Sequence, residues 1–172
     1  LQEKVGRILL NGYPTGVEVC EVMLKRLPRL RKFGINTTGL TPHRAIPMLT
    51  KIVELCDKRG VIFSTRVSID GVGDMHNDVR QVKRGFEKAN ETIRAMKELQ
   101  KKHPFNFGIS TTLFHMNLDD AENILAWSKT EELDTVFNMV RFTEPMLGNT
   151  ELAATAGVHG EEEERMRQFF LD

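Results

Sequence analysis

The stretch Val61-Ile62-Phe63-Ser64-Thr65-Arg66-Val67-Ser68-Ile69-Asp70-Gly71, continued by Asp74-Met75-His76-Asn77-Asp78-Val79-Arg80, decides the fold. An apolar run rich in β-branched residues stops at Gly71, and a polar loop leads into a long amphipathic segment. This pattern predicts a strand, a functional loop and a helix of a parallel α/β sheet. Ligands bind at the carboxyl ends of parallel strands, so Ser68, Asp70 and the loop after them are the first candidates for a site. The alternative is a strand end that simply turns at Asp70-Gly71.

The rest of the chain continues this alternation. Apolar patterning and turn residues predict strands at 7–10, 33–37, 61–69, 105–113 and 135–142, and helices at 17–30, 46–58, 82–100, 118–127 and from 161 onward. Strict alternation requires parallel strands joined by right-handed crossovers. We therefore predict an α/β fold, a partial (β/α) barrel with parallel strands, in the form of an incomplete TIM-like barrel missing its first strand. Residues 1–142 form this core, and residues 143–172 form a C-terminal loop and helix that pack on it or extend it.

Composition limits the classes of protein that fit. A chain of 172 residues suits one domain with a substantial core. The 24 basic and 24 acidic residues cancel, so no overall field attracts nucleic acid or an anionic membrane. No run approaches the roughly 18 apolar residues of a membrane span, and the first residues lack the pattern of a signal peptide. We expect a cytoplasmic protein without a membrane partner, and the charge balance disfavours nucleic acid.

Two pairs of residues could bind a metal ion, but each pair can also have a purely structural role. Cys20 and Cys56 lie in separate helical segments, and we interpret them as buried free thiols that pack like small hydrophobic residues, ahead of a disulfide or a metal pair. His76 and Asp78 could form a metal or acid/base pair, but a hydrogen-bond network within the loop is favoured. We expect Asp70 to brace the turn and Arg80 to pair with Asp78, neither of them being catalytic.

Four motifs in order resemble those of one superfamily. Ser68-Ile69-Asp70-Gly71, followed by His76, Asp78 and Arg80 and a long helix, resembles the S-(I/L)-D-G … H-D-x-x-R run of radical S-adenosylmethionine (radical SAM) proteins, especially their peptide-modifying, SPASM-like branch. The segment 35–40 is similar to the T-N-G-L motif, with Thr38 in place of Asn. Residues 10–15 fall where the family has G-G-E-P-T, and Ile109 to Leu113 with Asn117 is similar to T-x-x … N. The resemblance extends from about residue 7 to 142.

The resemblance implies a fold, a cofactor and a set of contacts. The family has a partial (β/α)6 barrel whose first strand leads into C-x-x-x-C-x-x-C, and these thiolates bind a [4Fe–4S] cluster. The cluster cleaves S-adenosylmethionine reductively, and the resulting 5′-deoxyadenosyl radical abstracts hydrogen from a substrate. By resemblance, Ser68 contacts the cofactor ribose, and the other cofactor-binding candidates are Gly12, Tyr13, Pro14, Thr38 and Gly39. No residue is assigned as catalytic or as a metal ligand. The substrate is unknown, a peptide being one candidate.

The departures from the family bear on activity. The chain has no C-x-x-x-C-x-x-C, and Tyr13 stands where a glutamate would hold the ammonium group of the cofactor. A phenol carries no charge at neutral pH, and Asn11 replaces the first glycine of the same motif. We therefore expect neither S-adenosylmethionine nor [4Fe–4S] to be bound to this chain, and we expect it to be inactive alone.

Three readings are compatible with these motifs. The chain is a fragment of a radical SAM core with its cluster segment upstream, or a degenerate non-catalytic barrel that acts as a binding or scaffold module. The third reading is an unrelated α/β barrel enzyme that acts on a small anion through His76, Asp78 and Arg80. Without the first strand, the edge strand carrying Ile8 would be unpaired, which favours self-association. In the first reading, Tyr13, Thr38, Ser68 and Thr112 share one rim.

Overall fold

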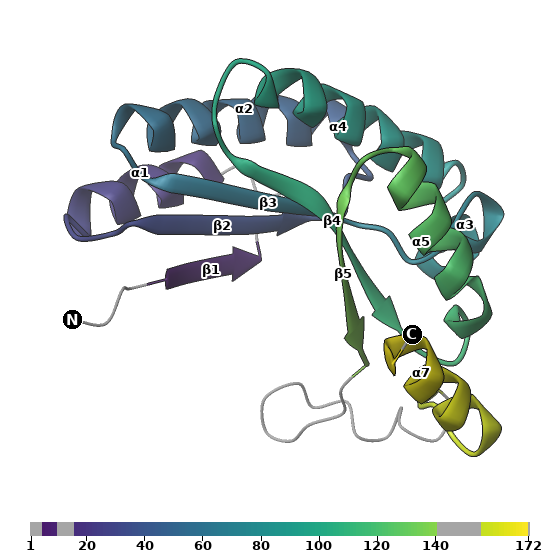
Figure 1. Ribbon diagram of the computed structural model, residues 1–172. Helices are drawn as coiled ribbons and strands as arrows, with labels where there is room; N and C mark the ends of the chain where they lie inside the picture. Colours follow the sequence, from purple (N-terminus) through teal and green to yellow (C-terminus); the bar gives the residue numbers. More distant parts are fainter. Residues whose placement is uncertain (1–4, 10–15, 141–155, 172) are drawn as a thin grey trace.

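Five parallel strands form the only sheet in the part of the chain that the structure describes. The computed structural model describes residues 5–9, for which we consider the backbone alone, 16–140 and 156–171. The strands are β1 (Val5–Leu9), β2 (Lys32–Thr37), β3 (Ile62–Ser68), β4 (Asn106–Leu113) and β5 (Asp134–Met139), and they lie side by side in chain order. Every neighbouring pair is parallel. Over the described residues β1 and β5 are the two edges, so the sheet is curved but not closed (Figure 1).

The helices that connect the strands cover one face of this sheet, as Figure 1 shows. They are α1 (Gly16–Arg26), α2 (Pro42–Lys58), α4 (Gly85–Gln100) and α5 (Ala121–Thr130), the last preceded by a 3₁₀ turn, η1 (Leu118–Asp120). Local sequence sets their ends. Proline opens α2 at its first position, where no amide donor is needed, and Gly60 follows its end with φ +63°. The partial parallel α/β barrel predicted from the sequence is confirmed.

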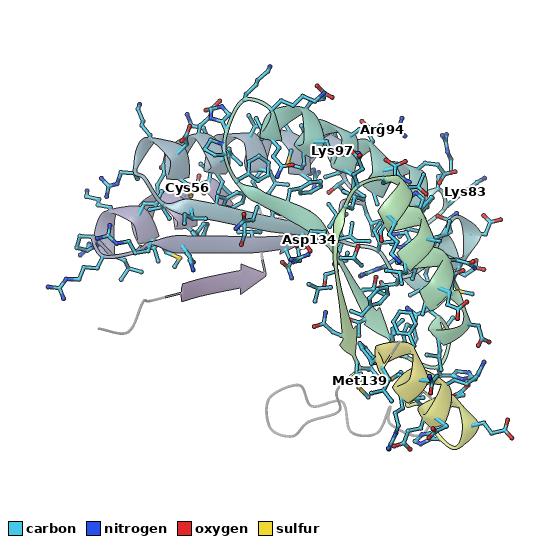
Figure 2. The ribbon with its side chains drawn as sticks, in the orientation of Figure 1. Cys56, Lys83, Arg94, Lys97, Asp134 and Met139 are labelled. Carbon is cyan, nitrogen blue, oxygen red and sulfur yellow. The ribbon has the colours of Figure 1, made fainter. Side chains whose placement is uncertain are left out.

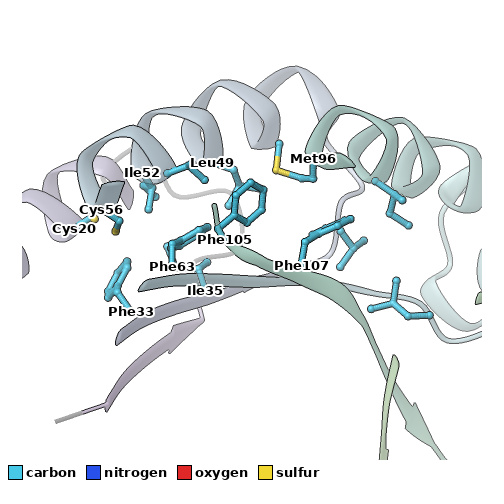
Figure 3. Packing of buried hydrophobic residues seen from close by; sticks show 14 of the residues in the cluster. Cys20, Phe33, Ile35, Leu49, Ile52, Cys56, Phe63, Met96, Phe105 and Phe107 are labelled. Atoms are coloured by element: carbon cyan, nitrogen blue, oxygen red, sulfur yellow. The ribbon is translucent and has the colours of Figure 1, made fainter. Parts of the chain in front are cut away.

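The core lies between the helices and the sheet. Along β3, Phe63, Thr65 and Val67 are buried, whereas the alternate residues are exposed or half-buried on the opposite face. Side chains from β2, β4 and the helices complete the main cluster shown in Figure 3, which includes Phe33, Ile35, Leu49, Ile52, Met96, Phe105 and Phe107. No helix within the described ranges is long and apolar enough to span a membrane.

The helix α7 (Glu161–Leu171) lies beside the carboxyl ends of β4 and β5 (Figure 1). Four glutamates occupy its first turn, where the helix dipole favours negative charge. Met166 is buried in a second cluster with Leu113 and Leu118, and the rings of Phe169 and Phe137 meet edge to face with centroids 4.9 Å apart. The helix α7 therefore packs against side chains of β4, β5 and η1.

One helix of the structure was not predicted from the sequence. The residues after β3 were predicted to form a loop up to Arg80, but Asp74–Arg80 form a two-turn helix, α3. The segment is too short to show an apolar period, so the pattern alone does not reveal it. The predicted end of the last strand, residues 141 and 142, lies outside the described residues.

Candidate functional site

The carboxyl ends of β2, β3 and β4 meet at one edge of the sheet. We call this edge the rim and define it by Thr38–Thr41, Ser68–Gly73 and Thr112–Asn117. Thr37 of β2 pairs with Val67 of β3, and Ser68 pairs with Ser110 of β4, so Thr38, Ser68 and Thr112 follow one another around the rim. Thr38 and Ser68 are half-buried and Thr112 is exposed. No hydrogen bond joins the Ser68 hydroxyl to another described residue.

Asp70 is the centre of a buried network that shapes the rim after β3. Its carboxylate accepts a hydrogen bond from the Thr112 amide at 3.3 Å and forms an ion pair with Arg80, with Oδ2 2.5 Å from Nη2. The side chain of Asp70 is 8% exposed and that of Arg80 27% exposed. Burial raises the pKa of Asp70, and the Arg80 charge acts against this shift. A carboxylate held in this way is structural, because its acceptor positions face the protein.

His76 supports the same turn from α3. Its Nδ1 lies 3.1 Å from the Asp70 amide, which donates to it, so in the neutral ring the proton is on Nε2. The side chain is fully buried, and burial together with the nearby charge of Arg80 lowers the pKa of His76 to about 4. Its Nε2 has no partner among the described residues. At neutral pH the imidazole is therefore an uncharged acceptor that fixes the backbone.

Two residues near η1 tie the β3 loop to β4. The Asn117 side-chain amide donates to the carbonyl of Asp70 and to that of Thr112, both at 3.0 Å, and Asn117 is fully buried. Asp120 accepts a hydrogen bond of 2.6 Å from the Val72 amide. Because backbone groups on both sides of the rim are held by side chains, this part of the loop is preorganised.

The turn after β2 is fixed by α4. Gly39 has φ +68°, and its amide donates to the Thr37 hydroxyl, while the Thr92 hydroxyl donates to its carbonyl at 3.0 Å. A Cβ at this position would lie 2.9 Å from Val67 and 3.2 Å from the Cα of Ala89. Glycine is thus required both by the left-handed backbone and by the close approach of α4.

The face of the sheet that none of the described helices covers carries an arginine, Arg66, that reaches across two strands to Asp134, which is labelled in Figure 2. Arg66 of β3 donates from Nη1 to the carbonyls of Ile109 and Asp134, and its Nη2 lies 2.5 Å from the Asp134 carboxylate. The guanidinium passes over Gly108, where a Cβ would lie 2.9 Å from Nη1. Asn36, Arg66, Gly108 and Asp134 share one register row, nearer the amino ends of the strands than Ser68. This row forms a polar floor beneath the rim.

The structure describes three of the six residues predicted to bind the cofactor. Thr38, Gly39 and Ser68 all belong to the rim, where Gly39 is buried, and Gly12, Tyr13 and Pro14 lie outside the described residues. The predicted pairing of Arg80 with Asp78 is wrong. Arg80 pairs with Asp70, because the turns of α3 carry the guanidinium back over the strand end.

Several residues that shape the site were not predicted to do so. Sequence reasoning assigned no role to Arg66 or Asp134, and it placed Asp120 only at the start of a helix. The partners of these residues lie more than 40 residues away in the chain. The sequence did offer one signal, because a glycine in the middle of a strand, here Gly108, often marks a site where another group approaches the backbone closely.

Potential metal ligands do not gather in the described part of the chain. No group of three or more histidine, cysteine or acidic residues could hold an ion there. Cys20 and Cys56 are free and buried in the core beneath α1 and α2, as predicted. Two histidines outside the core have acidic neighbours instead: His103 contacts Asp57 at 2.8 Å and His115 contacts Glu162 at 3.0 Å.

Comparison with known proteins gives one short match. No protein-family model matches the chain. A segment of 43 residues, 24% of the chain, is 44% identical to part of alpha-ketoglutaric semialdehyde dehydrogenase 2 from Azospirillum brasilense and covers 8% of that protein. A match of this extent shows no family for the chain, and the rim geometry is the stronger guide to function.

Proposed function

We propose that this chain forms most of the (β/α) core of a radical SAM enzyme, of the peptide-modifying branch, whose cluster-binding segment lies in sequence outside the chain. The observation that carries the proposal is the position of Ser68. Its hydroxyl ends β3 at the rim without a described partner, and two of the three charged residues of its motif, Asp70 and Arg80, bind each other. A motif in which the charged residues brace the turn and the serine is left available suits recognition of an uncharged hydroxyl-bearing group, such as a ribose.

The residues fit the two parts of the cofactor system differently. The chain contains two cysteines, both in the core, so it does not fit a cluster with three thiolate ligands. We assign the nucleoside part of S-adenosylmethionine to the rim, with Ser68 toward the ribose and Thr38 beside it. Cleaved S-adenosylmethionine would supply the radical for hydrogen abstraction. The contribution of this chain is to bind, orient and exclude water, which is the usual role of a protein around such a cofactor.

A degenerate barrel that acts as a binding or scaffold module is the second candidate. The sequence favours it at two positions of the loop before α1, where Tyr13 and Asn11 replace the acidic residue and the glycine of the family. Such a module would keep the rim and lose the chemistry.

The third reading, an anion-binding enzyme based on His76, Asp78 and Arg80, has lost its support. His76 is fully buried and accepts a backbone hydrogen bond, and Arg80 is paired with Asp70. Neither side chain is free to bind a small anion.

The proposal extends to the substrate, the location of the protein and its partners. The branch of the superfamily that the motifs resemble suggests a peptide substrate in the cytoplasm. The equal numbers of basic and acidic residues argue against nucleic acid. Among the described residues β1 pairs only with β2, so its other edge offers a site of self-association by strand pairing.

The coding sequence upstream of Leu1 tests the first candidate against the second. Three cysteines spaced C-x-x-x-C-x-x-C after a strand-like run would support an enzyme core, and their absence would support the scaffold module. Calorimetry on the chain as it stands should show weak binding of S-adenosylmethionine, because the open iron and the acidic residue are both absent. Ser68→Ala should remove the residual binding, with Ser64→Ala, on the same face of β3, as the matched control. Tight binding that Ser68→Ala leaves unchanged would refute the assigned site.

A further inference from the structure

The two cysteines of the chain meet in the core although they lie on different helices. Cys20 is in the second turn of α1 and Cys56 is near the end of α2, and both are fully buried. Figure 3 shows the two residues next to each other between the helices and β2. The Cys56 thiol donates a hydrogen bond to the Cys20 sulfur. This contact places one thiol within reach of the other in the folded protein.

We propose that Cys20 and Cys56 form a reversible disulfide that crosslinks α1 to α2 when the protein is exposed to a small disulfide such as oxidised glutathione. The contact between the thiols is already part of the fold, so closing the bond brings no distant segments together. Distinct helices carry the two residues, which makes the bond a true crosslink between elements.

The hydrogen bond gives the two thiols different chemical roles. It lowers the pKa of Cys20, because an anionic sulfur is the better acceptor, and it raises the pKa of Cys56, which must keep its proton to donate. The thiolate is the nucleophile in disulfide exchange, so Cys20 attacks first.

The exchange balances in two steps. The Cys20 thiolate attacks one sulfur of oxidised glutathione, a mixed disulfide forms, and one glutathione leaves and takes up a proton. Cys56 then loses its proton and attacks the Cys20 sulfur, and the second glutathione leaves. Two protein thiols lose two electrons in total, and one oxidised glutathione becomes two reduced molecules.

Burial controls the rate of this reaction, not its equilibrium. Both thiols are sealed from solvent, so exchange requires α1 to separate briefly from α2. Figure 1 shows α1 as the outermost helix of the layer, beside the edge strand β1. Outer elements of a fold open locally at a lower free energy than its centre.

The test is an equilibrium measurement on the full chain. The protein is held in buffers of graded reduced and oxidised glutathione, with and without concentrated urea, then quenched with acid, alkylated and weighed by mass spectrometry. The chain has two cysteines, so any intramolecular disulfide is this one. We expect the folded chain to form it with an equilibrium constant at least about tenfold larger than that of the unfolded chain, because the fold holds the thiols together.

By linkage, the oxidised protein should also unfold at a higher temperature than the reduced protein, and dithiothreitol should reverse the shift. Cys56→Ser is the control, since Cys20 alone can form only a mixed disulfide with glutathione or a dimer. An equilibrium constant in the folded chain equal to or below that in urea would overturn the proposal, as would oxidation that yields only dimers between chains. The rim is not involved, so failure here would leave the proposed function untouched.

Discussion

Lowering the pH from 7 to 4 should destabilise this protein through one buried histidine. His76 is fully buried, and its Nδ1 accepts the hydrogen bond of the Asp70 amide. A protonated imidazole has two N–H donors and no acceptor, so protonation removes this hydrogen bond and places a buried positive charge near Arg80. Protonation in the folded state is therefore unfavourable, and the cost appears as lost stability.

The size of the effect follows from the pKa. In the unfolded chain His76 has an ordinary pKa of 6.5, and the fold lowers it to about 4. Between these values the unfolded state binds more protons, so stability falls as the pH falls from about 6.5 to about 4. At 1.36 kcal/mol per pKa unit, the loss is about 3 kcal/mol. The raised pKa of Asp70 acts in the opposite direction at the acid end of this range and reduces the net loss there.

The assay is urea unfolding at a series of pH values for three proteins. His76→Asn keeps an acceptor for the Asp70 amide but has no group that titrates, so its stability should fall less steeply than that of the wild type, by about 3 kcal/mol over the range. His43→Asn removes an exposed histidine from the first turn of α2 and should follow the wild type. Parallel pH profiles for wild type and His76→Asn would refute the reasoning.

Two further substitutions test the packing around the site. Arg80→Met should destabilise the fold by about 3 kcal/mol, because it leaves the Asp70 carboxylate buried without its partner. Asp78→Asn should change stability by less than about 0.5 kcal/mol. Equal losses for the two variants in urea unfolding would instead support the pairing of Arg80 with Asp78 that the sequence predicted. Gly108→Ala should lower the free energy of unfolding by about 2 kcal/mol, because the added Cβ would press on the backbone of β5. Gly34→Ala should lower it clearly less, because its Cβ meets a serine hydroxyl that can rotate, and thermal unfolding measures both. Similar losses at the two glycines would contradict the close approach.

The fold was predictable because the apolar residues of its main strands and helices recur at regular spacings in the sequence. The runs of β3 and β4 and the stripe of α4 each follow one clear pattern, so their type and order could be derived without a structure. The end of α1 and the start of α2 were located less well. The helices predicted at 17–30 and 46–58 differ from the observed ones by four residues at these two ends, although Pro28 lies just beyond the first helix and Pro42 opens the second. The helix α3 carried no such signal, because two turns are shorter than any useful period.

The candidate site was predictable only as a location. Strand ends in a parallel sheet indicated the rim, but sequence order could not show which charges would meet across it. Arg80 is two residues from Asp78 and ten from Asp70, yet it pairs with Asp70, since the geometry of α3 decides the contact. The meeting of Cys20 with Cys56 was hidden for the same reason, because it depends on how two helices pack.

Release of 5′-deoxyadenosine tests the central proposal most directly. The protein extended by its upstream coding sequence would be reconstituted with iron and sulfide without oxygen, then given S-adenosylmethionine and a strong reductant. We expect 5′-deoxyadenosine from this protein and its loss in Ser68→Ala, with iron content unchanged. An iron-loaded protein that forms no 5′-deoxyadenosine, or a Ser68→Ala variant as active as the parent, would contradict the assignment of the rim.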